Sequence, residues 1–466
     1  MVGLGSESNP LRVAIIGAGP TAFYAAEHLF KQREVVIEVD MYDRLPTPFG
    51  LVRGGVAPDH QKIKSVTKAY DRTAANPRFR FYGYVEFGSD ITLDDLKKHY
   101  HQFIFTTGAQ TDRSLGIPGE DLKGSHAATE FVAWYNGHPD YRDLKFDLSQ
   151  EQAAVVGVGN VAVDVARILC RTPEELAETD IADYAEKALR ESRIKEVYML
   201  GRRGPAQAAF TNPEIKELGE MPGADIVVLP EEAELDSLSK QSVEEDKSTA
   251  RKVEILREYA ARNGNGKARK LVVRFLVSPV ELMGNDAGEV ATMKIVKNEL
   301  YATETGTLRP RATETFEELP VGLVFRSVGY RGVPLPGVPF HEKWGVILNE
   351  KGRVIDLGTE KPVTGLYTAG WIKRGPSGVI GTNKPDALET VNCMMEDLAS
   401  GSTLTPSTPE PSAVEKLVRE RRPNFVSWKD WRRLDEIEVS KGEKEGRPRV
   451  KFTTVEEMQE ALGRQP

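Results

Sequence analysis

The sequence predicts an α/β protein with two Rossmann-like dinucleotide-binding domains, the second of which is inserted into the first. The prediction rests on two Gly-x-Gly-x-x-Ala turns, residues 17–22 and 157–162, each directly after an apolar run typical of a buried strand. Glycine at the first two positions lets the backbone turn tightly and approach a pyrophosphate, and a small third residue lets helix and strand pack closely. One such turn is weak evidence, but two in one chain indicate two bound dinucleotides.

The composition is that of a globular protein with more than one domain. The chain has 466 residues, of which 40% are apolar and 28% charged, and its formal net charge is −8. A chain of this length exceeds what a single core supports, so we expect two or three domains. The negative charge opposes any general affinity for nucleic acid.

Neither a membrane span nor an export signal is visible in the sequence. No apolar run approaches the roughly 18 residues that suggest a transmembrane helix, and Met1–Pro10 lacks the pattern of a signal peptide. Only Cys170 and Cys393 are present, which leaves no closely spaced pair for disulfide exchange and too few thiolates for an iron–sulfur cluster. We therefore expect a cytoplasmic protein with no metal of its own, in which both thiols are buried.

The order of apolar runs and helical stretches predicts how the two domains share the chain. Residues 11–109 alternate short apolar runs with helical stretches, as in a parallel sheet covered by helices. They form the first segment of the first domain. The remaining segments are the second domain at 110–328, the return to the first domain at 329–401, a Pro-, Ser- and Thr-rich linker at 402–413, and a helical appendage at 414–466.

Individual strands are expected where short apolar runs are bounded by glycine or polar residues. Leu323–Tyr330 repeats the strand-into-glycine pattern of Phe103–Ala109, so both mark crossings between the domains. Arg171–Arg193 is interpreted as a polar insertion that prolongs the helix after the second turn. The expected strands are Val13–Ile16, Val35–Met41, Phe103–Phe105, Ala153–Val156, Val197–Leu200 and Leu271–Val277.

The first turn, with Gly17 and Gly19, is expected to hold an adenosine without a 2′-phosphate. Asp43 follows the second strand of this unit, where a carboxylate accepts hydrogen bonds from the ribose hydroxyls. The dinucleotide is therefore FAD or NAD.

The second unit favours a phosphorylated ribose. Its second strand ends in Arg202 and Arg203, with no acid at the tip. Guanidinium groups bind phosphate through paired, charge-assisted hydrogen bonds, and an acid there would repel it. We therefore expect NADP(H). The distance from Gly157 to Arg202 exceeds the usual ~20 residues, which we attribute to the insertion.

An FAD site and an NADP site in one chain suggest hydride transfer from nicotinamide to flavin. Reduced flavin can release its electrons singly, which NADPH cannot readily do. The natural acceptors are one-electron carriers such as ferredoxins.

Five blocks of residues carry a resemblance to a known family: 45–53, 56–60, 202–205, 209–211 and 370–384. Together they resemble the adrenodoxin-reductase-like ferredoxin–NADP⁺ reductases, most closely the bacterial members, and the resemblance covers nearly the whole chain in order. It implies the discontinuous two-domain layout, FAD as prosthetic group, NADPH as electron donor and a ferredoxin as acceptor.

The resemblance also implies site residues. His60 and Glu217 are the family's candidate proton-handling residues near the nicotinamide, and hydride transfer itself needs no general base. Those implied to contact FAD are Thr21, Ala22, Asp43, Leu51, Val85, Trp371, Gly378, Val379 and Ile380. Those implied to contact NADP are Arg113, Gly159, Asn160, Val161, Arg202, Arg203, Glu214 and Gly378.

Two positions differ from related proteins. Trp371 stands where related two-nucleotide flavoproteins usually have Asp, although a Trp beside the flavin is typical of this family. Lys216 stands where the family commonly has Arg, between Glu214 and Glu217. The compact ammonium group of lysine replaces the planar guanidinium of arginine at this position, which changes the ion pairs that can form with the neighbouring glutamates.

Cations crowd the region around a helix at 249–262. They are interpreted either as a docking surface for an acidic ferredoxin or as an ordinary solvated helix balanced by Glu254 and Glu258. The cations are Arg251, Lys252, Arg257, Arg262, Lys267, Arg269 and Lys270. Three other functions are compatible with the same residues: a flavin-dependent NADPH monooxygenase, the electron-input subunit of a larger complex, and a non-catalytic module that senses NADPH. The oligomeric state does not follow from the sequence.

Overall fold

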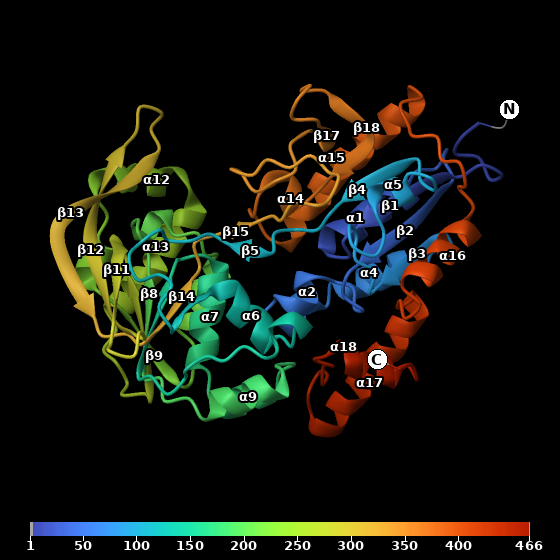
Figure 1. The fold of residues 1–466 in the computed structure, drawn as a ribbon. Coiled ribbons are helices and arrows are strands. Elements are labelled where there is room, and N and C mark those ends of the chain that lie inside the picture. Colours follow the sequence, from blue (N-terminus) through green and yellow to red (C-terminus); the bar gives the residue numbers. More distant parts are fainter. Residues whose placement is uncertain (1–2, 466) are drawn as a thin grey trace. The chain divides into compact units, whose positions relative to one another are not determined.

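The computed structural model describes residues 3–465, which form two compact units (Figure 1). Unit 1 contains the chain up to Val56, then His60–Thr111 and everything from Gly329 onward. Unit 2 contains Ala57–Asp59 and Asp112–Val328. Where the chain passes from one unit to the other, β5 (Thr111–Asp112) pairs with β15 (Tyr330–Arg331) in a two-stranded sheet.

Unit 1 is built on a seven-stranded sheet in the order β16-β17-β18-β4-β1-β2-β3. The strands from β18 to β3 pair in parallel, whereas β16 and β17 add an antiparallel edge. The parallel pairs place the carboxyl ends of the strands at one edge, where ligands bind in such sheets. The strands are β1 (Leu11–Ile16), β2 (Ile37–Asp43), β3 (Phe79–Gly83), β4 (Gln102–Phe105), β16 (Asn349–Glu350), β17 (Arg353–Ile355) and β18 (Pro362–Thr368).

Helices of very different length cover this sheet. The long helix after β18 packs against the helix after β1. The helices are α1 (Pro20–Phe30), α2 (Leu51–Gly54), α3 (Gln61–Lys64), α4 (Thr67–Ala74), α5 (Leu93–Leu96), α14 (Trp371–Arg374), α15 (Asn383–Ala399), α16 (Pro411–Arg421), α17 (Trp428–Glu445) and α18 (Val455–Ala461), with a 3₁₀ turn, η3, at Ile380–Thr382.

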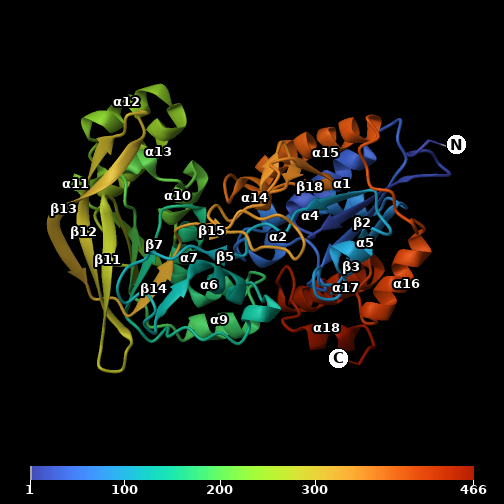
Figure 2. The same ribbon diagram turned by 45° about the horizontal axis from the view of Figure 1, so that its top comes forward.

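The C-terminal helices are part of the packing of unit 1. Figure 2 shows α17 beside β3. Gly83 and Val426 exchange two backbone hydrogen bonds at this place (both 2.8 Å). Trp431 and Leu434 of α17 are at most 1% exposed and belong to the same hydrophobic cluster as strands β1 and β2.

Unit 2 is built on a six-stranded parallel sheet in the order β6-β14-β7-β8-β10-β9. A three-stranded antiparallel sheet, β11-β12-β13, belongs to the same unit. The strands are β6 (Ser125–Ala127), β7 (Gln152–Val156), β8 (Glu196–Leu200), β9 (Ala224–Val228), β10 (Arg269–Arg274), β11 (Val277–Gly284), β12 (Val290–Ala302), β13 (Leu308–Leu319) and β14 (Leu323–Arg326).

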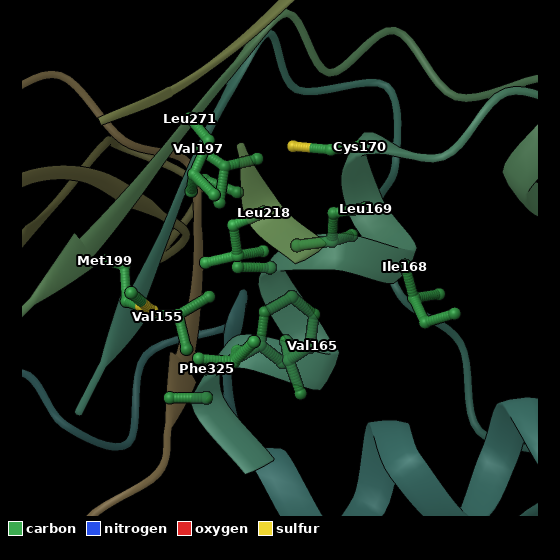
Figure 3. Packing of buried hydrophobic residues seen from close by; sticks show 14 of the residues in the cluster. Val155, Val165, Ile168, Leu169, Cys170, Val197, Met199, Leu218, Leu271 and Phe325 are labelled. Carbon is green, nitrogen blue, oxygen red and sulfur yellow. The ribbon is translucent and has the colours of Figure 1, made fainter. Parts of the chain in front are cut away.

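The core of unit 2 lies between the parallel sheet and its helices. Figure 3 shows Val155, Met199 and Phe325 of the strands close to Val165 and Leu169 of the helix after β7. The helices are α6 (Ala128–Tyr135), α7 (Asn160–Cys170), α8 (Pro173–Ala177), α9 (Asp183–Arg190), α10 (Asn212–Leu218), α11 (Pro230–Ala233), α12 (Ser237–Glu245) and α13 (Lys247–Ala260), with 3₁₀ turns at Pro139–Tyr141 (η1) and Pro205–Gln207 (η2).

Two expectations about elements are wrong. The insertion Arg171–Arg193 does not prolong the helix after the second turn: α7 ends at Cys170, and Thr172 caps a new helix with Pro173 at its first position. The expected strand Leu271–Val277 is two strands, because Leu276 adopts a left-handed conformation (φ +56°) that breaks the extended backbone.

The cysteine expectation is confirmed, since Cys170 and Cys393 are both buried and free. None of the helices formed by residues 3–465 is long and apolar enough to cross a membrane.

A buried histidine in unit 2 predicts a pH dependence of stability. Burial lowers the pKa of His126 to about 4, with a smaller contribution from the Arg326 guanidinium. The unfolded chain therefore binds more protons than the folded one between about pH 6.5 and pH 4, so stability falls as the pH drops through this interval. We expect His126→Gln to reduce the loss of urea midpoint between pH 7 and pH 5, followed by circular dichroism. An unchanged loss would contradict this.

Candidate dinucleotide-binding sites

The first glycine turn leaves the start of α1 open. Gly17 has φ +99°, and a Cβ there would lie 2.9 Å from the carbonyl oxygen of Thr106. Gly19 is the N-cap of α1 and has no side chain to cap the helix, and a Cβ built on it meets no described atom within 4 Å. The start of the helix therefore adjoins a space in which a phosphate group would be favourably placed.

Two further glycines bring other segments against this turn. A Cβ at Gly50 (φ +48°) would lie 2.9 Å from the Cα of Gly19. A Cβ at Gly370 (φ +80°) would lie 2.4 Å from Oγ1 of Thr21. These glycines are the N-caps of α2 and α14, so Leu51 and Trp371 begin helices beside the turn. Glycine backbone and the Thr21 side chain line this cradle, which fits a dinucleotide.

Asp43 braces the same turn from the end of β2. Its carboxylate accepts hydrogen bonds from the backbone N–H groups of Ala18 (2.8 Å) and Leu45 (2.9 Å). Burial raises the pKa of Asp43, and these two donors oppose the rise. Val85 is 1% exposed and donates its N–H to the Asp43 carbonyl (2.9 Å). The carboxylate of Asp43 therefore lies at the glycine turn, and its contact with a ribose stays a prediction.

Trp371 is tied to the loop that contains Gly378, Val379 and Ile380. Its Nε1–H donates to the carbonyl of Ser377 (3.1 Å). Gly378 has φ +80°, and Val379 is 51% exposed. Ile380 begins the 3₁₀ turn that leads into α15. The predicted residues Trp371, Gly378, Val379 and Ile380 therefore belong to one loop region of unit 1. This region begins at Gly370, which lies against Thr21.

The second glycine turn repeats this geometry in unit 2. Gly157 has φ +140°, and a Cβ there would lie 2.2 Å from the carbonyl oxygen of Ser327. Gly159 is the N-cap of α7, and a Cβ built on it meets no atom of the described residues within 4 Å. Asn160 and Val161 form the first turn of α7, and Oδ1 of Asn160 accepts the Thr211 N–H (2.9 Å).

Two arginines without an acidic partner follow β8. Among residues 3–465, neither Arg202 nor Arg203 forms an ion pair. Burial, and secondly the charge of Arg202, lower the pKa of Arg203. The turn is held through its backbone, since Asn298 donates to the Arg202 carbonyl (3.0 Å) and Leu276 to that of Arg203 (3.1 Å). Two adjacent guanidinium groups with free donors fit a ribose 2′-phosphate.

The other predicted residues of unit 2 lie on α10 and after β5. Glu214 and Glu217 both approach the guanidinium of Arg167, at 3.4 and 3.6 Å. Lys216 instead forms an exposed pair with Glu220 (3.7 Å). Arg113 lies exposed immediately after β5, and its place near a nucleotide stays a prediction.

Sequence reasoning missed Arg167. Its side chain is fully buried and also pairs with Asp59 (2.8 Å) and Asp164 (2.7 Å). The spacing of Asp164 and Arg167, three residues apart in the helix after the second turn, is the signal that was available. The planar guanidinium that approaches Glu214 and Glu217 is therefore that of Arg167. His60, at the N-terminus of α3, belongs to unit 1, so the two predicted proton-handling residues fall in different units.

The cations around α13 interact with other groups of unit 2, and their role in docking a ferredoxin stays a prediction. Three of its side chains donate to backbone carbonyls of their own unit: Lys252 to Ala208, Lys267 to Met221 and Arg262 to Gly219. Arg251, Arg257 and Lys270 pair with acids, and Arg269 donates to the carbonyl of Arg171. Each of these cations therefore has an interaction partner within unit 2.

Comparisons with known proteins agree with this geometry. The family described as pyridine nucleotide-disulphide oxidoreductase matches residues 11–200. NADPH-ferredoxin reductase FprA of Mycobacterium tuberculosis is 45% identical over 458 residues, which cover 96% of this chain and 98% of the relative. The NADPH:adrenodoxin oxidoreductase, mitochondrial, of Arabidopsis thaliana is 40% identical over 465 residues, covering 97% of this chain and 95% of the relative.

A solved structure agrees over the whole chain as well. Mycobacterium tuberculosis FprA in complex with NADPH superimposes with a TM-score of 0.91 at 44% identity, covering 98% of this chain and 100% of that one. The expected fold class is confirmed. By identity and coverage, the chain belongs to the family of the NADPH-ferredoxin reductases and NADPH:adrenodoxin oxidoreductases.

Proposed function

We propose that this protein is an NADPH:ferredoxin oxidoreductase in which unit 1 binds FAD and unit 2 binds NADP(H). When bound, FAD accepts a hydride from NADPH and passes single electrons to a ferredoxin-type iron–sulfur protein. The observation that carries the proposal is the unpaired Arg202–Arg203 turn in a chain that has an acid, Asp43, at the matching position of its other unit. Two buried free thiols support a reducing compartment, and we place the protein in the cytoplasm.

Residues of segments 11–109 and 329–401 hold FAD in this proposal. The open start of α1 receives the pyrophosphate, and Asp43 receives the adenosine ribose. The loop before α15 lies beside the flavin. The proposed contacts are Gly17, Gly19, Thr21, Ala22, Asp43, Leu51, Val85, Trp371, Gly378, Val379 and Ile380.

Most of the residues proposed to hold NADP lie in segment 110–328. The start of α7 receives the pyrophosphate, and the two arginines after β8 receive the 2′-phosphate. His60 and Glu217 handle protons near the nicotinamide. The proposed contacts are Arg113, Gly159, Asn160, Val161, Arg202, Arg203, Glu214 and Gly378.

An anaerobic titration of the purified yellow protein, first with NADPH and in a second sample with NADH, tests the proposed function. We expect the flavin absorbance to bleach at a far lower concentration of NADPH, because the arginine turn selects the phosphorylated cofactor. A colourless protein that takes up no FAD would overturn the proposal. Equal sensitivity to the two cofactors would overturn the NADP assignment alone.

Removal of Arg203 tests how the protein selects NADPH over NADH. We expect Arg203→Ala to raise the KM for NADPH about 10- to 100-fold, because a charge-assisted hydrogen bond contributes about 1.5–3 kcal/mol. The KM for NADH should hardly change in steady-state dye reduction. Arg193→Ala, which removes an exposed arginine elsewhere in unit 2, is the matched control. Equal losses with both cofactors would mean that Arg203 does not contact the phosphate.

The two open glycines allow each site to be blocked separately. Gly19 and Gly159 have ordinary φ values and room for a methyl group, so Gly19→Ala and Gly159→Ala should fold normally. The added methyl group occupies the space reserved for phosphate. We expect Gly159→Ala to weaken NADPH binding while FAD content stays at the wild-type level, and Gly19→Ala to lower FAD content. Retained binding in both variants would contradict the placement of the pyrophosphates.

A further inference from the structure

Helix α17, in the C-terminal part of the chain, packs against a turn of unit 1 whose backbone is strained. Phe49 adopts φ +82°, which is unfavourable for a bulky residue, and Gly50 follows at φ +48°. The Phe49 ring is 6% exposed and lies in edge-to-face contact with Trp428 (6.1 Å between ring centroids) and Trp431 (5.7 Å). Strain of this kind persists only where the surroundings hold it.

The strained turn presses on the first glycine turn. The N–H of Phe49 donates to the carbonyl of Ala18 (2.7 Å). Gly50 approaches Gly19 so closely that a Cβ would lie 2.9 Å from its Cα. Its position therefore determines the shape of the space at the start of α1.

An ion pair links α2 to the C-terminal helix. Arg53 forms a two-pronged pair with the fully buried carboxylate of Glu438 (2.8 and 2.5 Å), and its guanidinium also lies over the Trp431 ring (5.3 Å). Glu438 further accepts from Arg449 (3.0 Å) and from the N–H of Phe452 (2.8 Å). Burial alone would raise the pKa of Glu438, but Arg53 and Arg449 hold it below its ordinary value.

Helix α2 depends on this link. It has four residues, and its N-cap is a glycine that has no side chain to cap it. A single helical turn is not stable by itself. Helix α17, in contrast, is anchored in the core of unit 1 through Trp431 and Leu434. The backbone position of Gly50–Arg53 therefore depends on α17, whose Glu438 holds the Arg53 side chain.

We propose that Glu438 is a positioning residue for the flavin site: through Arg53 it holds the Phe49–Leu51 turn against Gly19, and the C-terminal segment thereby determines FAD affinity. The inference rests on the proposed function, in that unit 1 binds FAD. Because its hydrogen bonds are made inside the protein, the pair acts by holding the backbone of the turn.

The test compares Glu438→Gln with Glu436→Gln, which makes the same change at an exposed position of the same helix. Loss of the carboxylate leaves two guanidinium groups without their buried partner, so we expect Glu438→Gln to raise the dissociation constant for FAD at least about tenfold. Release of FAD is followed by its fluorescence on dilution of the holoprotein. The visible circular dichroism of bound flavin should also change, and binding of adenosine 2′,5′-bisphosphate to unit 2 should not.

Two further variants keep the proposal testable if Glu438→Gln does not fold. Glu438→Asp retains the charge and should show a smaller loss of FAD, whereas Arg53→Lys loses the two-pronged geometry and should resemble Glu438→Gln. Wild-type FAD affinity and an unchanged flavin spectrum in Glu438→Gln and Arg53→Lys would overturn this inference and leave the proposed function intact. A wild-type protein that binds no FAD would overturn both.

Discussion

At each glycine turn the chain passes so close to a neighbouring strand end that any side chain would collide with a carbonyl oxygen. Gly17 meets Thr106 just after β4, and Gly157 meets Ser327 just after β14. In both sheets that strand lies directly beside the one that leads into the turn. The contact therefore aims the following helix N-terminus at the carboxyl edge of the sheet, and the rest of each site depends on where that helix begins.

Charge distinguishes two turns that are alike in their backbones. In unit 1 the strand beside the turn ends in Asp43, whose carboxylate receives backbone donors and is buried. In unit 2 the corresponding strand leads into Arg202 and Arg203, and burial makes it costly to keep Arg203 charged without an anion. A dianionic phosphate would relieve that cost, whereas it would be repelled at Asp43. The same fold is thus suited to two different adenosines.

Buried guanidinium–carboxylate contacts hold loops in both units. Arg167 of α7 forms ion pairs with Asp59 and with Glu214 and Glu217 of α10. Glu438 ties Arg53 of α2 to the C-terminal helix. In each contact one side chain is fully buried, so the loss of a partner would leave a buried charge with fewer groups to compensate it. Such contacts hold segments whose own helices are too short to be stable.

The sequence by itself determined the fold class, the two glycine turns, the acid and the arginine pair, because these are local patterns with a local physical cause. It misjudged Arg171–Arg193 and Leu271–Val277, where a cap at Thr172 and a left-handed residue at Leu276 interrupt otherwise continuous patterns. Tertiary structure alone decided that Gly50 and Gly370 lie against the first turn and that α17 packs against Phe49. Arg53 and Glu438 are 385 residues apart, and no local pattern relates two side chains that only the packed core brings together.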